Sequence, residues 1–390
     1  MIETFFIVLF ITVSLGTYAA VRQDGIDLFI LLSSAAKLLM CIAGLFFIIP
    51  FSGDDAATFQ AVAARWSEFG FLDIIETFDF SRSYVFVTII ALLYWLMDVN
   101  IAIPVFLNGI LGVLIFYFSH VLVKIMWKDR YIPKAFYLIL ALHPMLTINS
   151  AVVLRENFVI LFMVLAAIYL ARFSYSSSLS NAILFSLMIG ISTVFHGGMI
   201  FFVVGLPLYI LISAGKNFVL RAVGVLFVMG AFFAVLSFFE VAKLSELQQS
   251  GLTDDVISEM DSRRREAGTA YLTGMSASGP IDLLWQLPVR SVFLLLTPFP
   301  WQIGSFGHLI VAFDALFWWA IIWIFLRNVG NIWSNPSGRI LFLCLLFVLF
   351  AFAFGTSNFG TAVRHRAKFI ILGLALVAPF LPRFRFSPPR

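Results

Sequence analysis

Long apolar runs separated by short polar segments dominate this chain. A helix needs about 20 apolar residues to cross a bilayer, and about eleven runs approach that length. They predict membrane spans at 4–20, 27–50, 103–123, 135–152, 158–173, 181–196, 199–215, 222–240, 306–327, 340–356 and 367–382. We therefore expect an all-α fold, a polytopic transmembrane helical bundle that forms one integral membrane domain over residues 1–390.

Two further apolar stretches, 84–97 and 287–303, are expected to be juxtamembrane or re-entrant helices. The second contains several prolines, which interrupt a regular spanning helix.

Residues 2–20 resemble a signal peptide in hydrophobicity. However, they begin with acidic Glu3 instead of a basic segment, and a second apolar run follows at once. This pattern favours a retained helix.

Composition supports lipid as the main solvent of the chain. Of the 390 residues, 62% are hydrophobic and only 12% are charged, whereas soluble domains are about 25% charged. Both cysteines, Cys41 and Cys344, lie inside apolar runs, so no disulfide framework or zinc pattern is expected.

The positions of Lys and Arg predict the orientation. Short basic loops belong in the cytoplasm by the positive-inside rule, and they occur at 124–134, 216–221, 327–339 and the C-terminal tail. The outer face then receives 51–102, 153–157, 196–198, 241–305 and 355–366. These segments hold the unusual polar residues, so we expect one extracytoplasmic active site, with contributions from the external loops 52–102 and 242–305.

The first candidate group is acidic. Asp54 and Asp55 follow the second span directly, and two adjacent carboxylates need a metal, an arginine or water as a partner. They are predicted to be catalytic, as a general base or as ligands of a divalent cation, the one cofactor considered. The alternative is a helix cap, because residues 56–66 have a helical pattern.

The second and third groups lie in tight outer turns. Arg155, in the sequence Leu-Arg-Glu-Asn, is suited to bind phosphate through two parallel hydrogen bonds; the alternative is an ion pair with Glu156 at a helix end. His196, before two glycines, is suited to donate to a phosphate or to act as an acid or base. Its alternative role is to cap a helix.

The fourth group is the cationic turn at 355–368. It contains Arg364, His365, Arg366 and Lys368 on the predicted outer side, where a cationic cluster runs against the positive-inside trend. A lipid-linked phosphate would compensate it; anionic lipid headgroups are the alternative. Arg364 and Arg366 would lie roughly 200° apart on a regular helix, so we favour Arg364 as the phosphate ligand and expect both to converge only from an irregular loop.

A fifth group, in the long polar segment 242–283, is the triplet 263–265. Its middle residue, Arg264, is a further candidate for phosphate binding, and solvation of the loop is the alternative. The sequence Pro-Phe-Pro-Trp at 298–301 has the character of a rigid interfacial wedge, because Trp favours the headgroup level.

These motifs together resemble bacterial envelope polysaccharide enzymes. The acidic Gly-Asp-Asp loop after an early span resembles the C-type (GT-C-like) membrane glycosyltransferases, although an additional helix precedes it and the downstream tyrosine is out of register. Leu-Arg-Glu-Asn, Phe-His-Gly-Gly, Pro-Phe-Pro-Trp and the segment 355–369 resemble O-antigen and capsule repeat-unit polymerases. The resemblance implies a GT-C-like fold in the bacterial inner (cytoplasmic) membrane, with its active site towards the periplasm.

The resulting expectation is glycosyl transfer at the outer leaflet from a sugar or oligosaccharide on polyprenyl phosphate or pyrophosphate to a second lipid-linked glycan. Repeat-unit polymerisation is favoured, and a single-sugar transferase is the alternative within this class. No nucleotide-binding domain is visible, and nucleic acid is not an expected partner; other polysaccharide-assembly proteins are. A lipid-glycan transporter would need charges at mid-membrane, where Lys37 is the clearest example.

Overall fold

The computed structural model describes residues 2–49, 53–77, 84–213, 270–272, 275 and 280–383, without the side chains of residues 53, 54, 280, 283 and 306. Within these ranges the protein is built from helices, and strand pairing is limited to one isolated bridge between Ala270 and Asn358. The predicted span at 222–240 and the basic triplet at 263–265 lie outside the described residues.

Six of the described helices are long and apolar enough to cross a membrane. They are α1 (Ile2–Val21, extended by a short 3-10 turn), α2 (Asp27–Phe46), α6 (Ala102–Met126), α9 (Glu156–Ser176), α16 (Phe306–Ser334) and α17 (Pro336–Gly355). The expected class, a multi-pass helical membrane protein, therefore agrees with the structure in this coarse form.

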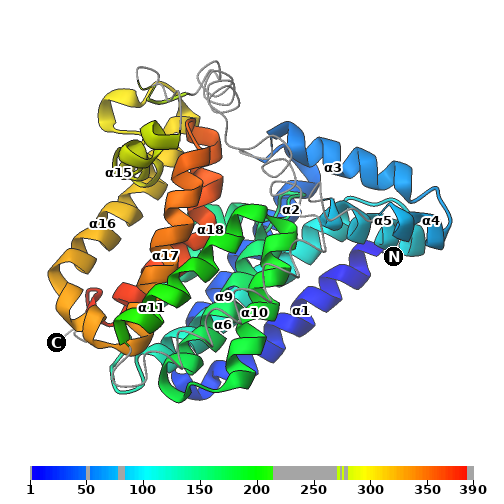
Figure 1. Cartoon of the computed structure of the whole chain (residues 1–390). Helices are drawn as coiled ribbons and strands as arrows, with labels where there is room; N and C mark the ends of the chain where they lie inside the picture. Colours follow the sequence, from blue (N-terminus) through cyan, green and yellow to red (C-terminus); the bar gives the residue numbers. More distant parts are fainter. Residues whose placement is uncertain are drawn as a thin grey trace, which may run out of the picture.

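The centre of the bundle is formed by α6 and α9. In α6, 72% of the most apolar window is buried inside the protein, against 28% in α1, α2 and α16. Around this centre, α9 packs against α10 (Leu179–Phe195), α17 and α18 (Phe359–Val377), and Figure 1 shows these helices side by side. The outer helices α1, α2 and α16 consequently leave large apolar surfaces for lipid.

Two of the apolar segments are interrupted. The single helix predicted over 135–152 is wrong: α7 (Lys134–Leu142) ends before Pro144, α8 spans only Pro144–Ile148, and no helix covers 149–155. Proline disfavours helical backbone in the residue before it, and His143 accordingly has ψ 123°. The segment predicted at 199–215 is a 3-10 helix, Gly197–Val204, followed by α11, Gly205–Ser213.

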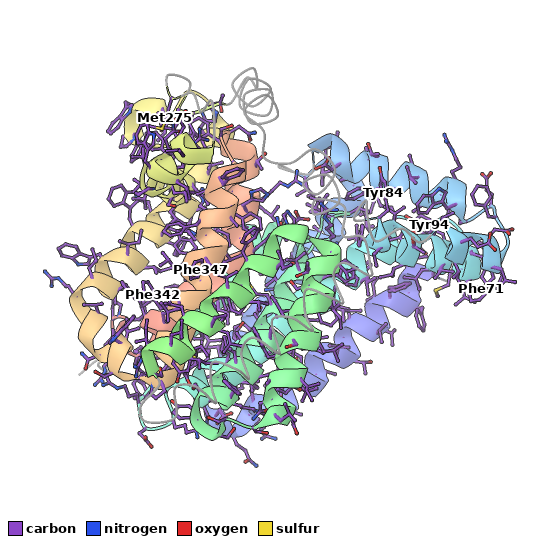
Figure 2. The ribbon with its side chains drawn as sticks, in the orientation of Figure 1. Phe71, Tyr84, Tyr94, Met275, Phe342 and Phe347 are labelled. Carbon is purple, nitrogen blue, oxygen red and sulfur yellow. The ribbon has the colours of Figure 1, made fainter. Side chains whose placement is uncertain are left out.

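A short helical arm projects from one end of the bundle. It consists of α3 (Gly53–Trp66), α4 (Phe71–Glu76) and α5 (Val85–Met97), with α3 and α5 side by side in Figure 1. The centre of the Phe59 ring on α3 lies 6.2 Å from the ring centre of Tyr84 and 6.0 Å from that of Phe86. Tyr84 is labelled in Figure 2. Phe86 in turn contacts Phe158 of α9 at 5.7 Å, so the aromatic contacts fix α3 against the bundle.

The remaining helices lie beside the C-terminal part of the bundle. They are α15 (Pro280–Leu296), which contains Pro288, and the 3-10 turns Pro300–Gln302 and Ala378–Phe380. The span predicted at 367–382 begins earlier than expected, at Phe359, because Asn358 caps the helix by accepting a hydrogen bond from the Thr361 amide. The cationic residues 364–368 therefore lie on a regular helix.

Candidate functional site

Charged side chains from three distant parts of the sequence meet at the end of the bundle that carries the arm. We call this group the charge cluster; it consists of Asp55, Arg155, Glu156, Arg364 and Lys368. Arg364 donates a hydrogen bond from Nη2 to Asp55 Oδ2 at 2.8 Å and lies 3.7 Å from Glu156 Oε1. Lys368 Nζ donates to the same Glu156 oxygen at 3.3 Å.

Helix geometry explains why Arg364 and Lys368 act together. They are four residues apart on α18, so both side chains lie on one side of the helix and reach towards the beginning of α9. Glu156 is the first residue of α9, where the helix dipole favours a carboxylate. Two cations contact its Oε1, whereas Oε2 receives no hydrogen bond from the described residues.

Solvent exposure falls from one side of the charge cluster to the other. The side chain of Asp55 is 54% exposed, that of Arg364 is 24% exposed, and that of Glu156 is 3% exposed. A buried carboxylate without a cation would be strongly destabilising, so Lys368 and Arg364 compensate Glu156. The half-exposed Asp55 needs no such compensation and is accessible to a ligand.

Arg155 connects the arm to the start of α9. Its guanidinium lies 5.7 Å from the centre of the Phe59 ring on α3, in the geometry of a cation–π contact. It is also close enough to Asp55, Glu156 and Arg364 to interact electrostatically with each. The charge cluster thus contains three cations and two carboxylates, which gives this set of side chains a net positive charge.

The two histidines from the sequence motifs lie next to each other beside the charge cluster. The rings of His196 and His365 are 5.5 Å apart, and both pack on Phe352 of α17. His365 Nδ1 forms a 2.7 Å hydrogen bond with Thr356 Oγ1. Lys368 Nζ lies 5.8 Å from the Phe352 ring, which joins the histidine pair to the charge cluster. A Cβ at Gly198 would come within 3.1 Å of Phe352, so this glycine permits a close helix approach.

Arg366 points away from the charge cluster. Its Nε lies 2.8 Å from Asp314 Oδ2 on α16, and both side chains are completely buried. Its guanidinium also donates to the carbonyl oxygens of Leu295, Thr297 and Val311 at 3.0, 2.5 and 3.1 Å. These partners tie α18 to α15 and α16, so the structure gives Arg366 a packing role and we leave it out of the proposed site.

Part of the loop 242–305 contacts the turn before α18. The Tyr271 amide donates to Ser357 O at 2.7 Å, and its hydroxyl donates to Thr356 O at 3.3 Å. Burial raises the pKa of the Tyr271 phenol above its ordinary value, so this group stays protonated. Arg264 and the side chain of Asp54 lie outside the described part of the structure, and their assigned roles stay predictions.

Three contacts of this region were not anticipated from the sequence: Glu156–Lys368, Arg366–Asp314 and His143–Asp314. The first joins residues of two recognised motifs, whereas Asp314 and His143 were not singled out at all. His143 Nε2 lies 3.4 Å from Asp314 Oδ1, with both side chains fully buried. The available signal was an acidic residue inside an apolar span, which needs a partner within the membrane.

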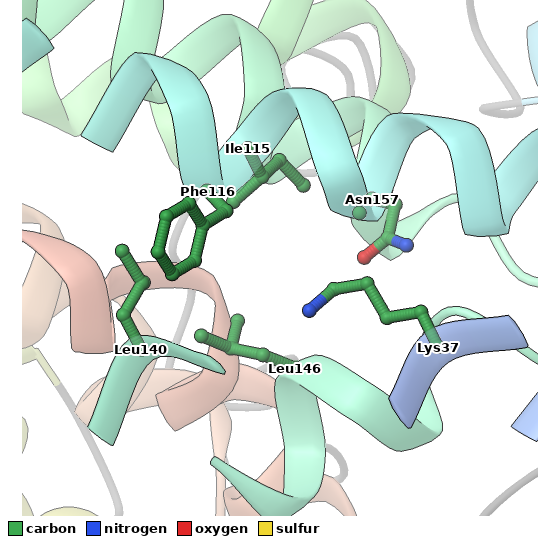
Figure 3. Close-up of a pocket in the computed structure, with 7 residues that line it drawn as sticks. Lys37, Ile115, Phe116, Leu140, Leu146 and Asn157 are labelled. Atoms are coloured by element: carbon green, nitrogen blue, oxygen red, sulfur yellow. The ribbon is translucent and has the colours of Figure 1, made fainter. Parts of the chain in front are cut away.

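The charge of Lys37 at mid-span is enclosed. Figure 3 shows Lys37 with Asn157, Phe116 and the other residues around it, and its Nζ donates to Ser33 Oγ at 2.7 Å. The surrounding side chains leave no room for a water molecule at this position. Lys37 is therefore a buried charge with a local hydroxyl partner, and the transporter alternative stays a prediction from the sequence.

Neither a metal site nor a related protein adds to the assignment of the charge cluster. Among the described residues, no group of three or more His, Cys, Asp or Glu side chains is placed to hold a metal ion. The divalent cation at Asp54 and Asp55 stays a prediction, because only one of the two carboxylates is described. No family model matches the chain, and no curated protein matches it either.

Proposed function

We propose that this protein is a membrane glycosyltransferase that acts at the outer leaflet on a polyprenyl phosphate- or pyrophosphate-linked donor, with polysaccharide repeat-unit polymerisation as its reaction. The observation that carries the proposal is the charge cluster. It combines a half-exposed carboxylate with three cations at one end of the helical bundle. Such a set can both activate a hydroxyl and bind a phosphate.

In the proposed reaction, the acceptor hydroxyl oxygen attacks the anomeric carbon of the donor sugar. The bond between that carbon and the phosphate oxygen breaks, and polyprenyl phosphate or pyrophosphate leaves. Asp55 takes the proton of the acceptor hydroxyl, while Arg364 and Arg155 stabilise the negative charge that develops on the leaving group. The buried Lys368 compensates Glu156 behind them. Glu156 is buried beneath these cations and receives no hydrogen bond at Oε2 from the described residues, so we assign it the role of positioning Lys368 and Arg364.

The ion pair between Asp55 and Arg364 gives a reason for coupling these two roles. While Arg364 is bonded to Asp55, the carboxylate is occupied by a cation. Asp55 accepts one hydrogen bond from Arg364 in this structure, whereas a phosphate offers the guanidinium an acceptor for two parallel hydrogen bonds. Donor binding would therefore draw Arg364 away from Asp55 and leave the carboxylate to accept a proton.

The finer parts of this proposal follow the resemblance described above. They comprise the GT-C-like architecture, the bacterial inner membrane and the association with other polysaccharide-assembly proteins. A single-sugar transferase would need the same carboxylate and the same phosphate site. It differs in donor, so the distinction belongs to an assay and not to the geometry of the charge cluster.

Topology is the first prediction. With Cys41 and Cys344 replaced, a cysteine at Thr58 on α3 should react with a membrane-impermeant maleimide in intact cells. A cysteine at Asp129, in the basic loop 124–134, should react only after permeabilisation. The loops 52–83, 242–283 and 355–366 should behave as Thr58 does, and 327–339 as Asp129 does. Labelling of position 58 only in permeabilised cells would move the charge cluster to the cytoplasmic side and refute the proposal.

Activity is tested directly with the protein reconstituted in liposomes. We expect a synthetic oligosaccharide on polyprenyl pyrophosphate to be converted into a ladder of longer products with release of polyprenyl pyrophosphate, while nucleotide sugars give none. Addition of one sugar from a polyprenyl phosphate monosaccharide would identify the single-sugar transferase instead. Movement of the lipid-linked glycan between leaflets without new glycosidic bonds would support the transporter.

A further inference from the structure

A second feature of the bundle is an apolar groove of about 570 Å³ at the break between α7 and α8. This volume falls in the range of binding pockets for small ligands, about 300–1,000 Å³. Its walls come from four elements, α2, the end of α7, α8 and α16, and include Ala36, Met40, Leu142, Pro144, Thr147, Leu309 and Phe313. Among the described residues, no charged side chain lines it, and none of the charge cluster residues does.

The groove lies between two of the helices with the least internal burial. Only 28% of the most apolar window is buried in both α2 and α16. Side chains at its edges, such as Leu142 and Phe313, are largely exposed, as is Leu39 on the neighbouring surface of α2. In a membrane these surfaces face hydrocarbon, so the groove is accessible sideways from the lipid.

Helix interruption places the groove here. Leu142 and Pro144, on either side of the non-helical His143, both line it. Since α8 ends after one short stretch at Ile148, no long helix from the described part of the chain separates α2 from α16 at this level. The same break holds His143 against the buried pair of Asp314 and Arg366, so the groove borders a structurally important part of the fold.

We propose that one acyl chain of a bilayer phospholipid fills this groove and forms part of the folded protein. Apolar cavities do not hold water, and an empty one would forfeit the dispersion contacts of its lining. The hydrocarbon of the surrounding lipid is as apolar as Leu and can enter from the side. The absence of charge on this lining means that the chain, and not the headgroup, is recognised. This inference depends on the membrane location and not on the proposed enzyme activity.

Filling the groove with a side chain should replace the lipid. Ala36→Phe places a ring inside it, and Met40→Phe does so one turn further along α2. Leu39→Phe adds a ring on the same helix but outside the lining, and is the matched control. We expect native mass spectrometry of detergent-purified wild type and Leu39→Phe to show one retained phospholipid, and the two groove variants to show little or none.

Thermal unfolding gives a second measurement with a defined sign. Adding dioleoylphosphatidylglycerol to delipidated wild type should raise its unfolding midpoint by about 2 °C or more, because a ligand that binds only the folded state stabilises it. In Ala36→Phe and Met40→Phe the lipid-dependent shift should be largely lost. Their midpoints without lipid should equal or exceed that of wild type, which also shows that both variants fold.

Equal lipid retention and equal midpoint shifts in the groove variants and Leu39→Phe would overturn the proposal. If one groove variant unfolds at a lower temperature than wild type without lipid, the comparison uses the second groove variant alone. The proposal would also be overturned if equimolar polyprenyl phosphate displaces the retained phospholipid from wild type but does not bind to Ala36→Phe. The groove would then hold a substrate chain. Loss of glycosyl transfer activity has no bearing on these readouts.

Discussion

Replacing Asp55 with Asn is expected to lower polysaccharide chain growth by about 10²-fold or more while the protein still accumulates in the membrane. Asn keeps the size of the side chain and much of its hydrogen bonding but cannot accept the acceptor's proton. The effect is measured as the rate of polymer formation from a polyprenyl pyrophosphate-linked oligosaccharide, with protein quantified by immunoblot. Asp54→Asn is tested in parallel, because the sequence motif includes both carboxylates.

A folding defect would not explain this loss. The side chain of Asp55 is 54% exposed, and exposed ion pairs contribute only about 0–1 kcal/mol to stability. The matched control is Glu76→Gln, which removes one exposed carboxylate from helix α4 of the same arm. Normal polymer from both Asp54→Asn and Asp55→Asn would reject a catalytic carboxylate at the start of α3.

The apolar pattern of the sequence predicted much of the helical framework but not its interruptions. The run 158–173 has no Pro or Gly and corresponds to α9, and the only proline of the run 103–123, Pro104, lies in the first turn of α6, where proline is tolerated. Pro144 sits in an equally apolar run, and proline within a membrane span can be either tolerated or disruptive. The outcome depends on tertiary partners, here the contact of His143 with Asp314, which hydropathy does not contain.

The candidate site shows the same division between local and long-range information. Placement of the polar motifs on one side of the membrane predicted that they would gather, and the structure brings Asp55 and Arg364 together across 309 positions. The 3.6-residue period predicted that Arg364 and Arg366 would diverge if the segment is helical and could converge if it is an irregular loop. The structure places both on α18, where they diverge. What the sequence could not provide was the partner of each charge: Glu156 for Lys368, and Asp314 for Arg366.

The divergence of the two arginines makes a pair of conservative substitutions informative. Arg364→Lys keeps the positive charge but loses the planar donor pair that matches a phosphate. We expect its chain growth to fall about 10-fold or more, since one hydrogen bond to a charged group is worth about 1.5–3 kcal/mol. The amount of protein and its unfolding midpoint should stay near those of wild type, because this residue is partly exposed.

Arg366→Lys should give the opposite result. Lysine can keep a charge near Asp314, but it cannot reach the three carbonyl oxygens that the guanidinium binds, and each buried group left without a partner costs about 1–3 kcal/mol. We therefore expect a lower unfolding midpoint and less protein in the membrane, with near-normal chain growth per folded molecule. Arg172→Lys, at the exposed far end of α9, is the control for the substitution itself.

If Lys is tolerated at both 364 and 366 in activity and stability, these arginines serve only to anchor α18. The phosphate site would then have to be sought at Arg155 or in the basic triplet 263–265.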